Sequence, residues 1–187
     1  SLLLEVDDIP EDAYTVLELS SFQLEWLGRE QWSPDVGVIT NLTPNHLDWH
    51  GTFEAYADAK WNLLRFQNEN SLSVLNAADE ELTRRMDGLS SRVVTFRLEA
   101  HDAPGAWVED GSVVMDDGTG TREIMPVSDI PLVGMHNVEN VMAACCAASP
   151  AGVPDRTIAA GVRSFTPVEH RLEFVTESAG VRYYNDS

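Results

Sequence analysis

Residues 36–75 read VGVITNLTPNHLDWHGTFEAYADAKWNLLRFQNENSLSVL, and the fold prediction depends on this stretch. Residues 36–40 and residues 71–75 are short apolar runs, the first of them rich in β-branched side chains, whereas residues 52–67 carry apolar side chains at helical spacing. Two parallel strands need a crossover between them, and that crossover is usually a helix. The order strand, helix, strand therefore predicts an α/β fold.

The sequence on both sides of this stretch extends the same alternation. Residues 14–18 form an apolar run that ends in an acid and predict a buried strand, and residues 20–29 predict a helix. Further along, residues 80–86 predict a helix and residues 92–97 a strand. The sequence thus predicts a mostly parallel sheet flanked by helices.

The segment of residues 103–130 has a different character and predicts a small antiparallel β insertion. Residues 106–108 and 112–115 flank a Glu-Asp-Gly turn, and a second turn follows at residues 116–120. After the insertion, the pattern predicts two helices and a closing hairpin around Ser178-Ala179-Gly180, over residues 136–148, 155–165 and 172–184.

Composition limits the classes of function. The chain has 187 residues with 43% hydrophobic content, which suits one domain with a sizeable core. A formal charge of -19 disfavours nucleic acid or an anionic membrane as a partner, because it repels phosphate. The adjacent Cys145 and Cys146 lie in an apolar helical stretch and predict buried thiols in a reducing compartment. With no apolar run long enough to cross a bilayer and no signal-peptide pattern, we expect a cytoplasmic protein.

Lys60 is the only lysine of the chain, beside 11 arginines, and its position in the predicted helix is unusual. At about 100° per residue, it falls in the middle of the apolar face, and the polar side chains lie opposite. Burial of an ammonium is costly unless it is paired or chemically altered, which points to a function. The alternative is a side chain whose stem packs on apolar surface while its amine reaches water. Periodicity alone leaves both interpretations open. The apolar face comprises Phe53, Tyr56, Ala57, Leu63 and Leu64, and the polar face Glu54, Asp58, Asn62 and Arg65.

Polar side chains also follow two of the predicted strands. Glu18 and Thr40-Asn41 stand at carboxyl ends, where open α/β sheets place their ligands, and a carboxylate there can bind Mg²⁺. The next loop carries His46 and Asp48 and leads into the helix of Lys60, so an acid, an imidazole and an amine can converge. The loop can equally be a set of helix caps with a hydrogen-bonded His46, which the residues alone favour.

Five motifs match a known family in its order and cover nearly the whole chain. They are ELSSFQLE at residues 18–25, TNLTPNHLDWHG at residues 40–51 followed by Ala-Asp-Ala-Lys60, GMHNVEN at residues 134–140, His170-Arg171, and Asn185-Asp186-Ser187. These motifs resemble those of the Mur ligase family. The Ser-Ser-Phe-Gln stretch is most similar to the branch that adds D-glutamate.

The resemblance implies a role for each matching residue. Glu18 is expected to bind the Mg²⁺ shared with the ATP phosphates, and His46 with a carbamylated Lys60 to hold a second Mg²⁺, so that Lys60 and His46 are the expected catalytic residues. The expected substrate contacts are Ser20, Gln23 and His46, and the expected ATP contacts are Asn137, Asn140, Arg171 and Asp186. An asparagine at a helix start is also an ordinary cap, and Arg171 or Asp186 can form a surface ion pair.

The implied activity is ATP-dependent addition of D-glutamate to UDP-N-acetylmuramoyl-L-alanine through an acyl phosphate, as a step of peptidoglycan synthesis by a monomeric cytoplasmic enzyme. The alternatives are a sister ligase adding another amino acid and a noncatalytic binding module of the same fold. Residues 1–187 are expected to form the central ATP-binding domain without its phosphate loop, because no Gly-x-x-x-x-Gly-Lys-Ser/Thr occurs. With the N-terminal and C-terminal domains also outside it, this portion is expected to be inactive alone. Asn45 stands where the family usually has an acid, which puts the second metal site in question.

Overall fold

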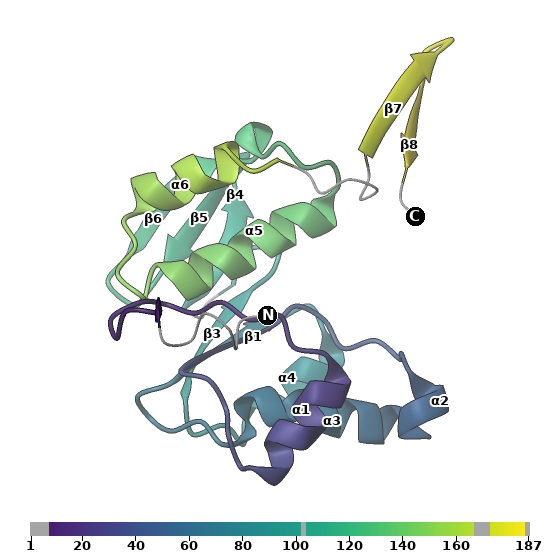
Figure 1. Cartoon of the computed structure of the whole chain (residues 1–187). Coiled ribbons are helices and arrows are strands. Elements are labelled where there is room, and N and C mark those ends of the chain that lie inside the picture. The colour runs from purple at the N-terminus through teal and green to yellow at the C-terminus, as the bar shows by residue number, and fades with distance from the viewer. Residues whose placement is uncertain (1–7, 102–103, 167–172, 186–187) are drawn as a thin grey trace.

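The computed structural model describes residues 8–101, 104–166 and 173–185, and its centre is a six-stranded sheet in the order β1-β2-β3-β4-β5-β6 (Figure 1). The first four strands run parallel, and β5 runs antiparallel to both of its neighbours, β4 and β6. The predicted mostly parallel sheet with a small antiparallel insertion is therefore confirmed. The strands are β1 (Val36–Ile39), β2 (Leu72–Asn76), β3 (Arg92–Phe96), β4 (Gly105–Glu109), β5 (Ser112–Asp116) and β6 (Thr121–Pro126).

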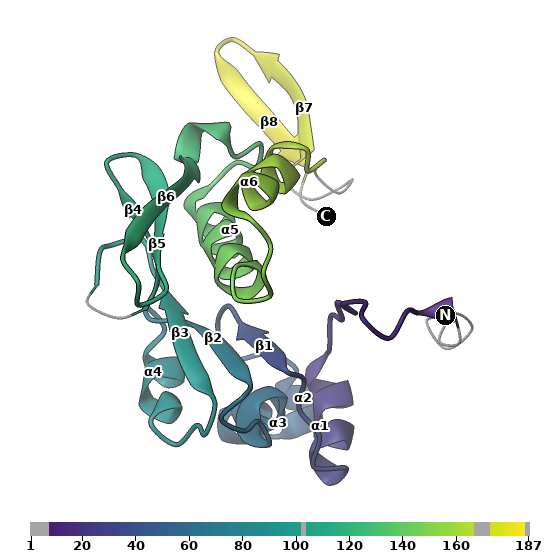
Figure 2. The ribbon, with the colours of Figure 1, turned by 90° about the vertical axis from the view of Figure 1, so that its left-hand side faces the viewer.

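Helices cover both faces of the sheet, as Figure 2 shows. On one face lie α3 (Phe53–Arg65) and α4 (Glu80–Met86), and α1 (Ser21–Arg29) packs on the outside of α3. On the other face α5 (Met135–Ala148) crosses the strands, and α6 (Asp155–Arg163) lies against β6. A one-turn helix, α2 (Leu47–His50), precedes α3, and a 3₁₀ turn, η3 (Val127–Asp129), follows β6.

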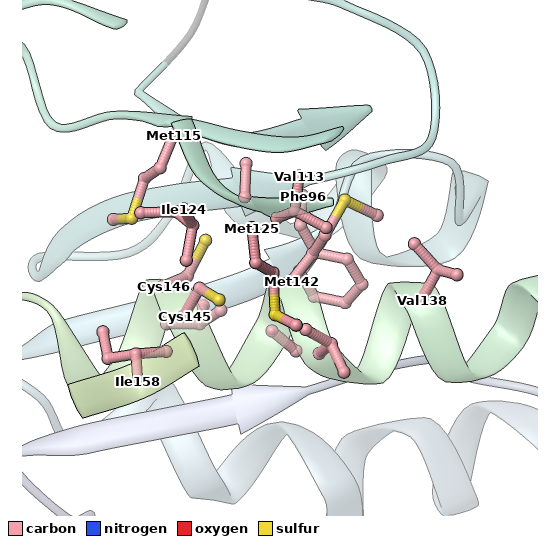
Figure 3. Packing of buried hydrophobic residues seen from close by; sticks show 14 of the residues in the cluster. Phe96, Val113, Met115, Ile124, Met125, Val138, Met142, Cys145, Cys146 and Ile158 are labelled. Atoms are coloured by element: carbon pink, nitrogen blue, oxygen red, sulfur yellow. The ribbon is translucent and has the colours of Figure 1, made fainter. Parts of the chain in front are cut away.

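Two apolar clusters hold these layers together. The larger lies between the sheet and α5 with α6, where Phe96, Val113 and Met142 are fully buried (Figure 3). The smaller lies on the other face, between the sheet and α3 with α4, and includes Ile39 and Leu75. Successive strand residues point to opposite faces, so a strand covered on both sides is buried along its whole length, as β2 is.

Cys145 and Cys146 lie within the larger cluster, as predicted, and neither forms a disulfide. Burial raises the pKa of both thiols to about 12. These side chains therefore act as small apolar core groups.

The predicted strand at residues 14–18 is not formed. Residues 13–20 have no regular secondary structure, and Val16 is 94% exposed. An extended segment becomes a strand only when a neighbour accepts and donates its backbone hydrogen bonds, and in the described part of the chain no strand pairs with this one. Glu18 therefore reaches its place through the start of α1 and not through a strand end.

The closing hairpin forms a separate two-stranded sheet of β7 (Glu173–Ser178) and β8 (Val181–Asn185). Both views draw it apart from the six-stranded sheet (Figures 1 and 2). Phe174, Val175, Val181 and Tyr183 are all exposed on it. Across the described ranges, no helix is both long and apolar enough to span a membrane.

Candidate functional site

Ser20 and Gln23 fix the start of α1 through a reciprocal capping box. The Ser20 hydroxyl accepts a hydrogen bond from the Gln23 backbone N–H at 3.3 Å, and the Gln23 side-chain oxygen accepts one from the Ser20 backbone N–H at 2.8 Å. This arrangement satisfies two backbone donors that a helix start otherwise leaves unpaired. Two of the three residues expected to contact substrate, Ser20 and Gln23, therefore also have a structural task that was not predicted from the sequence.

Lys60 lies half-buried on α3, between the buried Ala59 and Trp61. Burial lowers the pKa of the Lys60 amine, and the nearby Glu18 carboxylate opposes part of that effect. The structure thus brings the only lysine of the chain and the expected metal-binding acid within electrostatic reach of each other. A lowered pKa favours the neutral amine, which is the form that reacts as a nucleophile.

The helical-wheel prediction is correct for most of α3 but wrong for Asn62. Asn62 was assigned to the solvent face, yet it is buried, and its side-chain amide donates to the Leu24 carbonyl oxygen of α1 at 3.1 Å. A Cβ added at Gly28 would lie 2.2 Å from the Asn62 side-chain nitrogen, so α1 and α3 approach closely there. A second helix covers this side of α3, and the pattern of α3 alone contains no signal for that.

The loop after β1 is anchored by Leu42 and Asp79. Leu42 is buried, and its backbone N–H donates to the Asp79 carboxylate at 2.7 Å. The other oxygen of Asp79 accepts hydrogen bonds from Glu81 and Leu82 at the start of α4. Asp79 was not predicted from the sequence as an anchor of this loop. An aspartate directly before two glutamates at a predicted helix start was the signal that could have found it.

His46 is exposed and adopts a left-handed backbone conformation with φ 52°. It stands at the N-cap position of α2, but its side chain makes no capping hydrogen bond. Its ring instead contacts the ring of Phe22 on α1, with centroids 5.0 Å apart. The backbone N–H of His46 donates a hydrogen bond to the Asn45 side-chain oxygen at 2.8 Å, and the residue that caps the following helix α3 is Thr52.

By donor type, His46 and Lys60 suit a divalent cation only if Lys60 is chemically altered. Within the described residues, no group of three His, Cys, Asp or Glu side chains is placed to hold a metal ion. The expected second Mg²⁺ site of His46 and Lys60 therefore needs an oxygen donor, because a protonated amine at Lys60 would repel the cation. Reaction of the amine with CO₂ converts Lys60 into an anionic oxygen donor, which is the ligand type that Mg²⁺ prefers.

The expected nucleotide contacts Asn137 and Asn140 lie one turn apart at the start of α5. The Asn137 side-chain amide donates to the Val133 carbonyl oxygen at 2.8 Å, and Asn140 donates to the Asn137 side-chain oxygen at 3.3 Å. The cap of α5 is Gly134, with φ 102°, so neither asparagine is the N-cap. Nearby, Asn76 at the end of β2 donates to Glu139 of α5 at 3.3 Å, which joins this region to the carboxyl edge of the sheet.

Two other expected ATP contacts, Arg171 and Asp186, lie outside the described residues, as does His170. The adjacent Asn185 ends β8. The roles of Arg171 and Asp186 stay predictions.

Comparison with known proteins gives a consistent result. The sequence profile of the Mur ligase middle domain matches residues 2–148. A UDP-N-acetylmuramoylalanine–D-glutamate ligase of Acidobacterium capsulatum is 46% identical over 97% of this chain and 40% of its own length. A ligase of the same name from Koribacter versatilis is 44% identical over 95% of this chain and 39% of its own length. The chain thus spans about two fifths of these relatives.

Solved structures agree with the fold. A UDP-N-acetylmuramoyl-L-alanyl-D-glutamate–2,6-diaminopimelate ligase superimposes with a TM-score of 0.66 at 26% identity, over 87% of this chain and 34% of its own. MurF ligase from Thermotoga maritima, in complex with ADP, superimposes with a TM-score of 0.56 at 21% identity, over 83% of this chain and 36% of its own. At 21% identity, the similarity to the Thermotoga maritima structure shows the fold alone.

Proposed function

This chain belongs to the Mur ligase family as a middle domain, and from that premise we propose that it is the ATP-binding portion of a ligase that joins D-glutamate to UDP-N-acetylmuramoyl-L-alanine. The D-glutamate specificity is supported by relatives of that name that are 46% and 44% identical over nearly the whole chain. The diaminopimelate-adding structure is 26% identical. We further propose that the enzyme is cytoplasmic and monomeric and serves peptidoglycan synthesis.

The proposed reaction has two steps. The substrate carboxylate attacks the γ-phosphate of ATP and releases ADP, which gives an acyl phosphate, and the amine of D-glutamate then displaces phosphate to form the amide. Phosphoryl transfer needs little covalent help from a protein, so catalysis rests on positioning and on charge stabilisation. We assign Asn137 and Asn140 to the nucleoside, and Ser20 and Gln23 to the muramoyl substrate.

We propose that Glu18 holds a Mg²⁺ ion shared with the ATP phosphates, and that His46 and carbamylated Lys60 hold a second Mg²⁺ ion. When bound, the metal neutralises charge on the phosphate oxygens. The task of Glu18 is to present a carboxylate at the start of α1. The task of Lys60 is to supply a second anionic oxygen donor from α3, and that of His46 is to add a neutral nitrogen donor.

The observation that carries the proposal is the placement of Lys60. Lys60, the only lysine of the chain, lies half-buried on α3 within electrostatic reach of Glu18, the acid that precedes α1. A carbamate-forming amine gains from this partial burial, because burial lowers the pKa of the Lys60 amine and favours its neutral, reactive form.

The test compares Lys60→Ala with wild type in the full-length protein, with and without an added short-chain carboxylic acid. We expect turnover to fall at least about 100-fold and to recover partly with the added acid, because the acid replaces the lost carboxylate. Lys60→Arg, which keeps a cation and cannot form the carbamate, is the matched control and should not be rescued by bicarbonate. An alanine variant that keeps wild-type turnover without rescue would show that the carbamate role is wrong.

The choice of amino acid needs a separate measurement. The full-length enzyme is offered D-glutamate, diaminopimelate and L-alanine with UDP-N-acetylmuramoyl-L-alanine and ATP, and phosphate release is recorded. We expect turnover when D-glutamate is the amino acid offered, and none with diaminopimelate or L-alanine. Turnover with another amino acid would identify a sister ligase, and no turnover with any of them would favour the noncatalytic module.

A further inference from the structure

The segment that carries His46 is not held by burial. The four residues of α2 include no buried side chain, and the segment begins at the left-handed His46 and ends at Gly51, with φ 75°. A single helical turn is not stable by itself. Figure 1 shows α2 at the edge of the molecule, next to the start of α3. Something outside this segment must fix the direction of the His46 ring.

Several side chains of the segment contact the same ring, that of Phe22 on α1. Three aromatic side chains surround it, with ring centroids 5.0 Å away for His46, 5.3 Å for Trp49 and 5.7 Å for His50. The Trp49 ring meets Phe22 edge to face, and the His50 ring stacks on it at an interplanar angle of 19°. Both are favoured geometries for aromatic pairs.

Two hydrogen bonds flank this aromatic cluster and join the same two helices. The His50 ring nitrogen Nε2 lies 3.0 Å from the Ser21 hydroxyl, and the Trp49 indole N–H donates to the Glu25 carboxylate at 3.2 Å. They hold the C-terminal part of α2. His46 stands at the other end of the segment, where its own backbone N–H is bonded to the adjacent Asn45 side chain and its ring contacts Phe22.

We propose that Phe22 is the positioning residue for His46. Phe22 follows the Ser20 cap on the helix that begins just after Glu18, so its ring links the backbone of the expected metal-binding acid to the expected metal-binding histidine. The inference rests on the proposed function, because it assumes that the direction of the His46 ring matters for a bound cation. A histidine that binds a metal needs a partner that fixes its ring, and here an aromatic face does this instead of a carboxylate.

The test measures Mn²⁺ binding to the full-length protein, by the electron paramagnetic resonance signal of the free ion. We expect Phe22→Leu to raise the Mn²⁺ dissociation constant about 10-fold. Phe22→Tyr keeps the ring and should bind Mn²⁺ as wild type does. Trp26→Leu is the matched control, because it removes another aromatic ring from α1, one that is 63% exposed and stacks on Arg29; it should leave Mn²⁺ binding unchanged.

A double-mutant cycle separates positioning from general support of the fold. In a His46→Ala background, Phe22→Leu should weaken Mn²⁺ binding no further, because the residue through which it acts has gone. The proposal is overturned if Phe22→Leu weakens binding equally in both backgrounds, or if it leaves binding to wild-type His46 unchanged. Should Phe22→Leu fail to fold by circular dichroism, Phe22→Met keeps a comparable apolar volume and takes its place.

Failure of this proposal can be distinguished from failure of the proposed function. If Lys60→Ala abolishes turnover and Phe22→Leu leaves Mn²⁺ binding intact, the ligase assignment stands and the role of Phe22 falls. If the full-length protein makes no amide but the Phe22 and His46 variants show the coupled loss of Mn²⁺ binding, the role of Phe22 stands and the ligase assignment falls.

Discussion

The α5 face of the sheet and the α1–α2 edge are built in opposite ways. On the α5 face, Phe96, Met115 and Met142 have no exposed surface, and packing alone fixes them. At the α1–α2 edge, His46 and Trp49 are exposed and are held by ring contacts and single hydrogen bonds. Of the expected metal ligands, Glu18 and His46 are exposed, whereas Lys60 is half-buried on α3.

The difference indicates that the fold and the site depend on separate sets of contacts. Apolar burial is nondirectional and tolerates small changes of angle, so it suits a scaffold. Aromatic and hydrogen-bonded contacts depend on direction and leave the side chains accessible to ligands. Substitutions on the α5 face should therefore change stability, and substitutions at the α1–α2 edge should change binding more than stability.

The largest expected effect on stability is that of Phe96→Ala. Phe96 is fully buried in the larger cluster, so its truncation leaves a cavity and should lower the free energy of unfolding by about 3–5 kcal/mol. Urea denaturation followed by circular dichroism measures the change. Phe174→Ala, on the exposed face of the β7–β8 hairpin, is the matched control and should cost less than about 0.5 kcal/mol. Equal losses in the two variants would contradict the division between scaffold and surface.

An intermediate effect is expected for Arg85→Met, because Arg85 joins α3 to α4. Its guanidinium contacts Glu54 and Asp58 on α3 and Glu81 on α4, and its side chain is 10% exposed. Removal of the charge leaves three carboxylates close together, and we expect a loss of about 2 kcal/mol, between the values for exposed and buried ion pairs. Arg65→Met, whose contact with Asp58 is longer at 3.6 Å and more exposed, is the control and should lose less.

The free energy of unfolding of Arg85→Met should depend less on acidic pH than that of the wild type. Hydrogen bonds from Arg84 and Arg85 hold the pKa of the Glu81 carboxyl below its ordinary value of 4.5. The stability contributed by this depressed pKa is present at neutral pH and is lost as the pH falls through the folded-state pKa. Arg85→Met narrows the difference between the folded and unfolded pKa of Glu81. Below about pH 4.5, its stability should fall less steeply than that of wild type, and parallel curves would contradict this explanation.

The smallest effect on stability is expected for Ser20→Ala. This substitution tests whether a residue at the α1–α2 edge has a role beyond helix capping. Loss of the cap should cost about 1 kcal/mol in the free energy of unfolding. If Ser20 also contacts substrate as proposed, the KM for UDP-N-acetylmuramoyl-L-alanine rises in the full-length enzyme. Thr52→Ala removes the equivalent cap of α3 and should lower stability without a change in KM. The same KM in both variants would leave Ser20 with the capping role alone.

Much of this fold was predictable from local sequence, and the exceptions have physical reasons. The predicted helix at residues 80–86 matches α4, and the turn at Glu109-Asp110-Gly111 joins β4 to β5, because capping residues and turn residues act over a few positions. The strand at residues 14–18 failed because a strand requires a partner that the pattern of the segment itself cannot supply. Asn62 was wrongly assigned to the solvent-facing side because a helical wheel considers α3 alone, whereas in the structure α1 covers that side of α3.

By itself, the sequence determined the alternation of strands and helices, the family and the unusual position of Lys60, since apolar periodicity and short motifs are local properties of the chain. Only the tertiary structure decided that Glu18 lies within electrostatic reach of Lys60, that Asp79 anchors the loop after β1, and that Phe22 contacts the ring of His46. These are contacts between elements far apart along the chain. Their geometry follows from how α1, α3 and the loop after β1 pack together, which no single segment encodes.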